Sequence, residues 1–387
     1  GHETFIQQMA KQEVYYKLIY QKIRVRENRK GAKKMIKTKI YGTIGPASYQ
    51  KDTLVSLINN GMIGIRINLS HGNLNTYQDW IDNIREAEKE SGRKISIIAD
   101  VQGPEIRASL IEEDEIYLKE EEIISIATDS YSLNAQINKG IILNYPQIFR
   151  QIRSGQKILI DDGIIQLKVI SNKNSSENAN KKKETSLIKC KVIQGGKLGN
   201  KKSVNFPDLK LDIPSLNDKD RKDIKLAIEI GVNFIMLPFT RTLDDVMILR
   251  DYLDSLAAQN IGILAKIENQ EGIDNLSTFI EKIDGVIIAR GDLGVEIGLT
   301  KVPIAQKEII KLCNKYNKPS IVVTHMLESM IKSPLPSRAE ISDIANAVLD
   351  GCTGVMLTGE TAIGKYPVTA MKYMRDTIYT TENWKRS

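Results

Sequence analysis

Cysteine, histidine and tryptophan are scarce in this sequence, with three, three and two copies among 387 residues. The cysteines, Cys190, Cys313 and Cys352, are odd in number and far apart, which excludes a disulfide framework and a cysteine-based zinc site. No apolar run approaches the roughly 18 to 20 residues that a membrane-spanning helix needs. The first residues contain no hydrophobic signal run, so we expect an intracellular, soluble protein with no membrane partner.

The formal net charge of +7 is modest for a chain in which 27% of the residues are charged. The lysines are scattered along the sequence, and the run Lys181-Lys182-Lys183 falls in a polar loop. This distribution argues against a nucleic-acid partner and favours small phosphorylated anions as ligands.

Short apolar segments alternate with segments of helical periodicity, which indicates parallel strands joined by helices. Eight such repeats predict a closed (β/α)₈ barrel. The predicted strands are Thr38–Gly45, Ile63–Ser70, Ile95–Asp100, Phe234–Phe239, Gly262–Glu268, Gly285–Gly291, Ser320–Met326 and Gly354–Gly359. The clearest predicted helices are Asp218–Ile230, Thr242–Gln259, Pro303–Tyr316 and Ser337–Asp350.

The repeat is interrupted once, between the third and fourth strands, by about 100 residues that do not show the alternation of strand and helix. These predict an inserted β domain with short strands at Ile116–Leu118, Ile123–Ala127, Lys157–Asp161, Ile164–Ile170 and Leu187–Val192. Without the insertion, the remaining repeats have about the 250 residues typical of such a barrel. The predicted organisation is a helical N-terminal arm (1–30), the first part of the barrel (31–105), the inserted domain (106–205) and the second part of the barrel (206–387).

Polar side chains are concentrated where the predicted strands end. Alternation along the second strand places Arg66, Asn68 and Ser70 on one face, toward the barrel axis. Polar groups buried there without partners would each cost about 2–7 kcal/mol, and a bound ion or phosphate would supply the partners.

The fifth strand ends with Lys266 and Glu268 on one face, and Asp292 follows the sixth strand. Carboxylates at this position suit a divalent metal. Gly291 allows backbone N–H groups to approach an anion closely, and Thr324 adds a hydroxyl after the seventh strand. Because six of the eight strands end in such groups, the pattern predicts a metal and phosphate site at the barrel mouth.

Several segments resemble the pyruvate kinase family, in the same order and over nearly the whole barrel and the insertion. They are Thr43-Ile44-Gly45-Pro46-Ala47-Ser48, Arg66-Ile67-Asn68-Leu69-Ser70-His71-Gly72, Gly103-Pro104-Glu105-Ile106-Arg107, Asp161-Asp162-Gly163, Ala265-Lys266-Ile267-Glu268-Asn269, Ala289-Arg290-Gly291-Asp292-Leu293-Gly294-Val295-Glu296 and Met326-Leu327-Glu328-Ser329-Met330. The resemblance implies phosphoryl transfer between phosphoenolpyruvate and ADP in glycolysis, giving pyruvate and ATP. It also implies that the inserted domain is a small β-barrel that acts as a lid.

The resemblance assigns roles by position. Glu268 and Asp292 would hold Mg²⁺ or Mn²⁺, and Lys266 and Arg66 would neutralise the transferring phosphoryl group. Thr324 would belong to the relay that protonates the enolate.

The remaining assignments concern substrate, nucleotide and monovalent ion. The substrate would bind to Lys266, Gly291, Asp292 and Thr324. The nucleotide phosphates would lie at Arg107, Lys202 and Asp162. Potassium would bind to Asn68, Ser70, Asp100 and the carbonyl of Val101.

This sequence departs from the family pattern in several places. Val101 and Gln102 replace the usual Thr-Lys and resemble potassium-independent members, whereas Glu105 resembles members that need potassium; we expect potassium dependence. His325 stands where Gln is usual, and the sequence gives it no definite role. The family's C-terminal domain, which carries effector binding and part of a tetramer contact, is absent from these residues, and we expect a homo-oligomer, tetrameric in the full-length form.

Two alternatives remain open from the sequence. One is a Mg²⁺-dependent lyase or aldolase that stabilises a pyruvate enolate, which would explain Glu268 and Asp292 but not the additional cations. The other is a catalytically inactive barrel that serves as a scaffold. Richness in Lys, Asn and Ile indicates an AT-rich genome, as in an apicomplexan-type parasite, where the protein would be cytoplasmic or belong to a plastid-like organelle.

Overall fold

The structure is a computed structural model that describes residues 36–386 except 73, 111–112, 129–139, 173–186 and 208. The chain divides into two compact units, Gly1–Lys37 and Thr38–Ser387, and the description below concerns the second. The helical arm predicted for residues 1–30 lies outside the described residues. Among the residues described, the structure has no helix with the length and apolar character needed to cross a bilayer.

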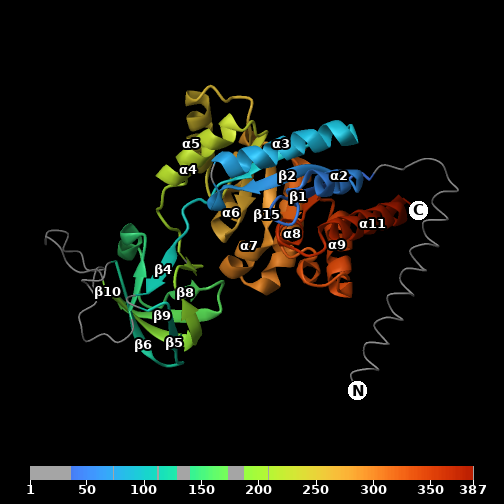
Figure 1. The fold of residues 1–387 in the computed structure, drawn as a ribbon. Helices are drawn as coiled ribbons and strands as arrows, with labels where there is room; N and C mark the ends of the chain where they lie inside the picture. The colour runs from blue at the N-terminus through green and yellow to red at the C-terminus, as the bar shows by residue number, and fades with distance from the viewer. Residues whose placement is uncertain are drawn as a thin grey trace, which may run out of the picture. The chain divides into compact units, whose positions relative to one another are not determined.

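The second unit contains a closed barrel of eight parallel strands, as the alternating pattern predicts (Figure 1). Around the barrel the strands follow the order β1-β17-β16-β15-β14-β13-β3-β2. They span β1 Lys39–Thr43, β2 Met62–Asn68, β3 Ser96–Asp100, β13 Phe234–Leu237, β14 Gly262–Ile267, β15 Gly285–Ala289, β16 Ser320–Val323 and β17 Gly354–Met356.

These strands form because their apolar residues are buried on both faces, as parallel sheets require. All five residues of β15 are buried. The interior of the barrel is filled by side chains from neighbouring strands, including Ile98, Met236, Leu264, Ile287, Ile321 and Met356. The barrel is therefore a packed core, and only its mouth is available for ligands.

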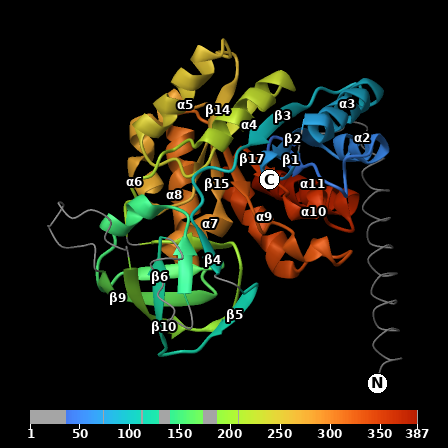
Figure 2. The same cartoon turned by 60° about the vertical axis from the view of Figure 1, so that its left-hand side comes forward.

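The helices lie on the outside of the large barrel (Figure 2). They are α2 Lys51–Asn59, α3 Leu74–Ser91, α4 Asp218–Glu229, α5 Leu243–Ser255, α6 Gln270–Phe279, α7 Arg290–Ile297, α8 Val302–Lys315, α9 Arg338–Asp350, α10 Gly359–Ala362 and α11 Pro367–Arg386. Capping boxes fix where three of them begin, as at α4, where Asn217 and Asp220 exchange side-chain and backbone hydrogen bonds.

A second, smaller closed barrel is built from residues between β3 and β13 in the sequence. Its strand order is β10-β6-β7-β4-β12-β8-β9, and β11 and β5 form a separate two-stranded sheet. The strands are β4 Arg107–Leu110, β5 Glu115–Leu118, β6 Ile123–Ala127, β7 Gly140–Leu143, β8 Lys157–Ile160, β9 Ile165–Asn172, β10 Leu187–Gln194, β11 Gly196–Gly199 and β12 Lys202–Asn205. The small barrel has its own apolar core, including Ile126, Ile141, Phe149, Ile158 and Val192.

Two segments connect the barrels, and both are anchored on the large-barrel side. On the outgoing segment, the Gly103 N–H donates to Asp220 (2.9 Å) and the Gly103 carbonyl accepts from Asn217 (3.1 Å). On the returning segment, the Arg241 guanidinium donates to the carbonyls of Leu211 (2.7 Å) and Ile213 (2.9 Å). These contacts fix the large-barrel ends of the connection.

The structure corrects several predicted strand boundaries. The second strand ends at Asn68 and not at Ser70, because the Asn68 side chain accepts from the Ser70 N–H (3.0 Å) and starts a 3₁₀ turn, η1 (Leu69–His71). Strand alternation therefore does not orient Ser70. The sixth strand ends at Ala289, so Gly291 lies in the first turn of α7, and the seventh ends at Val323, before Thr324.

Candidate active site

The predicted site is centred on a buried carboxylate, Asp100, at the end of β3. Its Oδ2 accepts from Arg66 Nε at 2.8 Å and lies 2.6 Å from Arg66 Nη2, and its Oδ1 lies 3.5 Å from Lys266 Nζ. Burial alone would raise the pKa of Asp100, but Lys266 and Arg66 lower it below its usual value. Asp100 therefore stays ionised and holds both cations at the barrel mouth.

Lys266 lies between two carboxylates, because its Nζ is also 3.1 Å from Glu268 Oε1. Burial would lower the pKa of this ammonium group, but Asp100, Glu268 and Asp292 raise it above its usual value. The Lys266 side chain is thus a permanent cation held in place by its neighbours.

Glu268 is almost fully buried, with 1% of its side chain exposed. Burial raises the pKa of its carboxyl; Lys266 opposes this effect and the negative charge of Asp292 adds to it. The Phe239 N–H donates to Glu268 Oε2 at 2.7 Å, and Phe239 adopts a left-handed φ of 46°. Since this conformation is unfavourable for a bulky residue, the surrounding packing must hold it in place.

The first turn of α7 faces the turn that follows β16. The Gly291 N–H donates to Thr324 Oγ1 at 2.8 Å, and Arg290, paired with Asp343 at 2.7 Å, donates to the Thr324 carbonyl, also at 2.7 Å. Thr324 and His325 both have left-handed φ angles, 69° and 54°. The backbone of this turn is thereby held with the Thr324 hydroxyl against the start of α7.

Two carboxylates, Glu268 and Asp292, are the candidates for a divalent cation. The negative charge of Asp292 disfavours ionisation of Glu268, and a cation between the two carboxyl groups would relieve this repulsion. Among the described residues, no group of three or more His, Cys, Asp or Glu side chains could hold a metal by itself. A pair of carboxylates is the donor set that suits Mg²⁺, which takes one or two carboxylates together with substrate oxygens.

The residues predicted to bind potassium lie at the ends of β2 and β3. Asn68 and Asp100 are partners in the parallel register of these strands, Val101 follows directly, and Ser70 lies in η1. Their oxygen atoms are therefore brought to one part of the barrel mouth, although the Asp100 carboxylate is also paired with Arg66 and Lys266.

The three residues predicted to bind the nucleotide belong to the small barrel. Arg107 on β4 and Ser203 on β12 are register partners. Lys202 lies 3.0 Å from Asp161, and Ser203 Oγ donates to Asp162 at 2.9 Å. Arg107 is paired with Glu105. The small barrel thus gathers two cations and two carboxylates at one edge.

Sequence reasoning assigned no role to three groups that contact predicted site residues: the Phe239 backbone, Asp161 and Ser203. Phe239 acts through an N–H group, which every residue except proline has, so its sequence carries no signal. Asp161 and Ser203 are sequence neighbours of the predicted site residues Asp162 and Lys202. In the structure, Asp161 and Asp162 have left-handed φ angles of 53° and 56°, which are typical of a tight turn.

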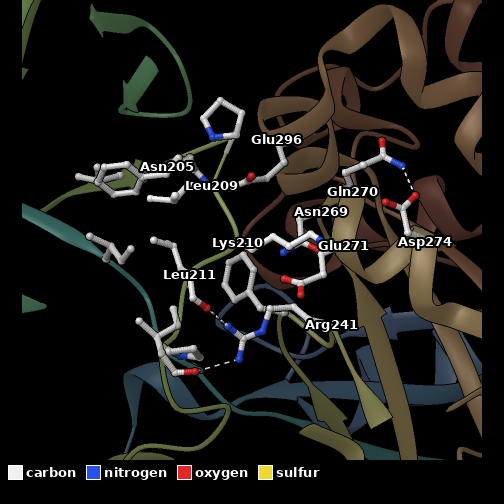
Figure 3. A pocket seen from close by; sticks show the side chains of 17 residues that line it. Asn205, Leu209, Lys210, Leu211, Arg241, Asn269, Gln270, Glu271, Asp274 and Glu296 are labelled. Carbon is white, nitrogen blue, oxygen red and sulfur yellow. Dashed lines mark hydrogen bonds between the residues drawn. The ribbon is translucent and has the colours of Figure 1, made fainter. Parts of the chain in front are cut away.

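A cleft of about 240 Å³ lies beside this site, between the connecting segments and α6 and α7 (Figure 3). None of the predicted site residues lines it. Two lining residues, Phe239 and Asn269, are neighbours of the predicted ligand Glu268: the Phe239 N–H donates to it, and Asn269 follows it in the sequence. The cleft is therefore adjacent to the predicted site.

Comparisons with known proteins agree with this architecture. Residues 35–371 match the family model described as "Pyruvate kinase, barrel domain". Pyruvate kinase from Geobacillus stearothermophilus is 45% identical over 346 residues, which are 89% of this chain and 57% of that protein. Pyruvate kinase from Bacillus licheniformis is 42% identical over 343 residues, 88% of this chain and 56% of that protein. The chain thus spans somewhat more than half the length of these relatives, and it belongs to the pyruvate kinase family.

Proposed function

We propose that this chain carries the catalytic region of a pyruvate kinase, which transfers a phosphoryl group from phosphoenolpyruvate to ADP and forms pyruvate and ATP. The observation that carries the proposal is the buried cluster in which Asp100 and Glu268 hold Arg66 and Lys266 at the barrel mouth. Two cations fixed in this way suit a phosphoryl group, whose negative charge is spread over three oxygens during transfer.

Lys266 and Arg66 would act by electrostatic stabilisation. Because their partners already hold them in place, the cations need little reorganisation when charge develops on the phosphoryl and enolate oxygens. Such preorganised groups are each worth roughly 3–4 kcal/mol in other enzymes. Glu268 and Asp292 would hold Mg²⁺ or Mn²⁺, which supplies further neutralisation of substrate oxygens.

The substrate carboxylate would bind at the first turn of α7. The Gly291 N–H, which donates to Thr324 Oγ1, would donate to the carboxylate instead, together with the Asp292 N–H and the Thr324 hydroxyl. When the phosphoryl group leaves the enol oxygen, the enolate carbon must gain one proton. Thr324 would relay that proton from water.

ADP would bind with its phosphates toward Arg107 and Lys202 of the small barrel, which would act as a lid over the mouth. Asp162 would contact the nucleotide from the same edge. Excluding water from the closed site would favour transfer to ADP over hydrolysis.

Potassium would bind through Asn68, Ser70, Asp100 and the carbonyl of Val101, whose oxygen atoms suit a hard cation. In the assay below, replacing K⁺ by tetramethylammonium at constant ionic strength should lower kcat several-fold. Undiminished turnover would refute potassium dependence and would leave the phosphoryl-transfer proposal untouched.

The decisive experiment is an assay of the purified full chain with phosphoenolpyruvate, ADP and Mg²⁺, in which lactate dehydrogenase and NADH report pyruvate. We expect pyruvate formation that needs both ADP and the metal. Pyruvate formed without ADP would favour the lyase or aldolase alternative, and no turnover by a folded chain that binds Mn²⁺ would favour the scaffold alternative.

A further inference from the structure

One hydrogen bond joins the small barrel to the helix that begins at the proposed substrate site. Asn205 Nδ2, at the end of β12, donates to Glu296 Oε1 on α7 at 2.6 Å. Figure 3 shows the Glu296 side chain extending toward Asn205 along the cleft. The contact is partly buried, and its acceptor is a carboxylate, so it is of the stronger, charge-assisted kind.

Both elements that meet at this contact also carry proposed ligand groups. Strand β12 begins with Lys202, a proposed nucleotide contact, and ends with Asn205. Helix α7 presents Gly291 and Asp292 in its first turn, and Glu296 follows Asp292 by four residues. A helix repeats its faces every three to four residues, so Asp292 and Glu296 lie on the same side of α7. A short strand and a short helix thus link the two proposed half-sites.

The contact lies beyond the anchors of the connecting segments. Asp220 and Arg241 hold those segments at Gly103 and at Leu211 and Ile213, on the large-barrel side. Asn205 belongs to the small barrel itself, so its bond to Glu296 restrains the barrel directly. This bond therefore acts on the orientation of the small barrel, whereas the anchors hold the connecting segments.

We propose that Glu296 is a positioning residue that orients the small barrel, through Asn205, so that its nucleotide-binding edge faces the proposed phosphoryl-transfer site. This inference rests on the proposed function and adds to it a residue outside the ligand contacts. Without the bond, each binding event would have to orient Lys202 and Arg107 toward the proposed phosphoryl-transfer site, and this ordering would lower the affinity for ADP.

The test exchanges donor and acceptor across the contact. Glu296→Ala removes the acceptor. Asn205→Asp replaces the donor by a carboxylate, which would repel the carboxylate of Glu296. Each should raise the KM for ADP about 5- to 10-fold, the equivalent of one charge-assisted hydrogen bond. In the double variant Asn205→Asp/Glu296→Gln, the glutamine amide donates to the new aspartate, and the KM for ADP should return to within about twofold of the parent value.

The KM for phosphoenolpyruvate, kcat at saturating ADP and the Tm should stay near their parent values, whereas a general loss of structure would change them together. Gln270→Ala is the matched control: Gln270 lines the same cleft, but it donates to Asp274 within α6 (2.8 Å). An unchanged or lower KM for ADP in Glu296→Ala, or no recovery in the double variant, would overturn the inference. If the parent chain formed no pyruvate from phosphoenolpyruvate and ADP, the proposed function would fail instead.

Discussion

At the scale of single residues, the site depends on charges that compensate one another. Asp100 is ionised because Lys266 and Arg66 surround it, and Lys266 stays protonated because Asp100, Glu268 and Asp292 surround it. Removal of one member leaves its partners buried without compensation, which costs about 3–5 kcal/mol for a typical buried pair. Substitutions here therefore affect both stability and the proposed chemistry.

Lys266→Met tests the proposed role of the ammonium group. Methionine keeps most of the side-chain volume and removes the charge, so kcat should fall by at least about 10³-fold. Mn²⁺ binding, measured by electron paramagnetic resonance, should persist because Glu268 and Asp292 remain. Lys301→Met, the same change at an exposed position, should leave kcat unchanged; retained turnover in Lys266→Met would refute the assigned role.

A second residue-scale test concerns barrel closure. A Cβ atom added to Gly64 on β2 would lie 2.5 Å from the Tyr41 ring of β1, and one added to Gly354 on β17 would lie 2.8 Å from the opposite edge of that ring. Gly64→Ala should therefore lower the free energy of unfolding by about 1–3 kcal/mol. Urea denaturation measures this, with Gly199→Ala as a control, because its new Cβ would meet the end of the flexible Lys202 side chain.

At the scale of elements, the sequence alone locates the eight strands and the helices α4, α5, α8 and α9, because long apolar and periodic runs define both. Strand ends are predicted less well. The 3₁₀ turn at Ser70 depends on a single hydrogen bond, and α7 begins at Arg290 without a side-chain cap; no hydrophobic pattern records either boundary. Strands β4, β7, β11 and β12 escape prediction, although β5 and β8, which have the same four-residue length, are predicted.

The same distinction between predictable and unpredictable features applies to the proposed site. Lys266, Glu268 and Arg66 are predictable, because polar residues in buried strands are conspicuous. The contact of Phe239 with Glu268 and that of Asn205 with Glu296 are not predictable, since they depend on tertiary distances.

Glu340 provides an element-scale prediction with a defined pH dependence. Its carboxylate accepts from the Ser337 N–H that precedes α9 and from Ser329 in η7 (Glu328–Ile331). Burial alone would raise the pKa of Glu340, but the hydrogen bonds from Ser329 and Ser337 lower it below 4.5, its unperturbed value. A lowered pKa in the folded state means that stabilisation is present at neutral pH and is lost as the pH falls through that lowered pKa.

We therefore expect Glu340→Gln to lower the free energy of unfolding at pH 7 by about 0.5–1 kcal/mol, a modest value because the group is partly exposed to solvent. The difference from the parent chain should shrink below pH 4.5, as the parent carboxylate becomes protonated. Urea denaturation at pH 7 and at pH 3.5 measures this. An equal difference at both pH values would contradict the assigned cause.

At the scale of the whole molecule, two closed barrels with separate apolar cores are joined by two segments. The apolar core of the small barrel consists of residues between Ile106 and Phe206, and none of these residues belongs to the interior of the large barrel. Each barrel should thus respond to destabilising conditions largely by itself.

The consequence is a prediction of two unfolding units. Hydrogen exchange followed by mass spectrometry in moderate urea should divide the amides of residues 107–205 from those of 218–370, with different free energies of opening. Mg²⁺ with phosphoenolpyruvate should protect the large-barrel class more strongly, because the proposed ligands belong to it. A single cooperative class across both ranges would show that the barrels unfold together.

Self-association remains a prediction from the family resemblance. Leu299, in the 3₁₀ turn η6 (Leu299–Lys301) before α8, and Ile304, in the first turn of α8, are 80% and 57% exposed. Exposed apolar side chains that form a patch often mark contact surfaces. Light scattering of the full chain should give a mass above that of the monomer. Leu299→Lys should lower that mass if this surface is used.

The pairing of β13 directly with β3 has a consequence for the history of the chain. The large barrel closes as though the residues between these strands were absent, so its hydrogen-bond ladder does not depend on what joins them. Ancestral barrels could have acquired the smaller one by a single insertion into a loop, with no strand exchanging its neighbour. Protein engineers could use the same junction to exchange the small barrel for another domain.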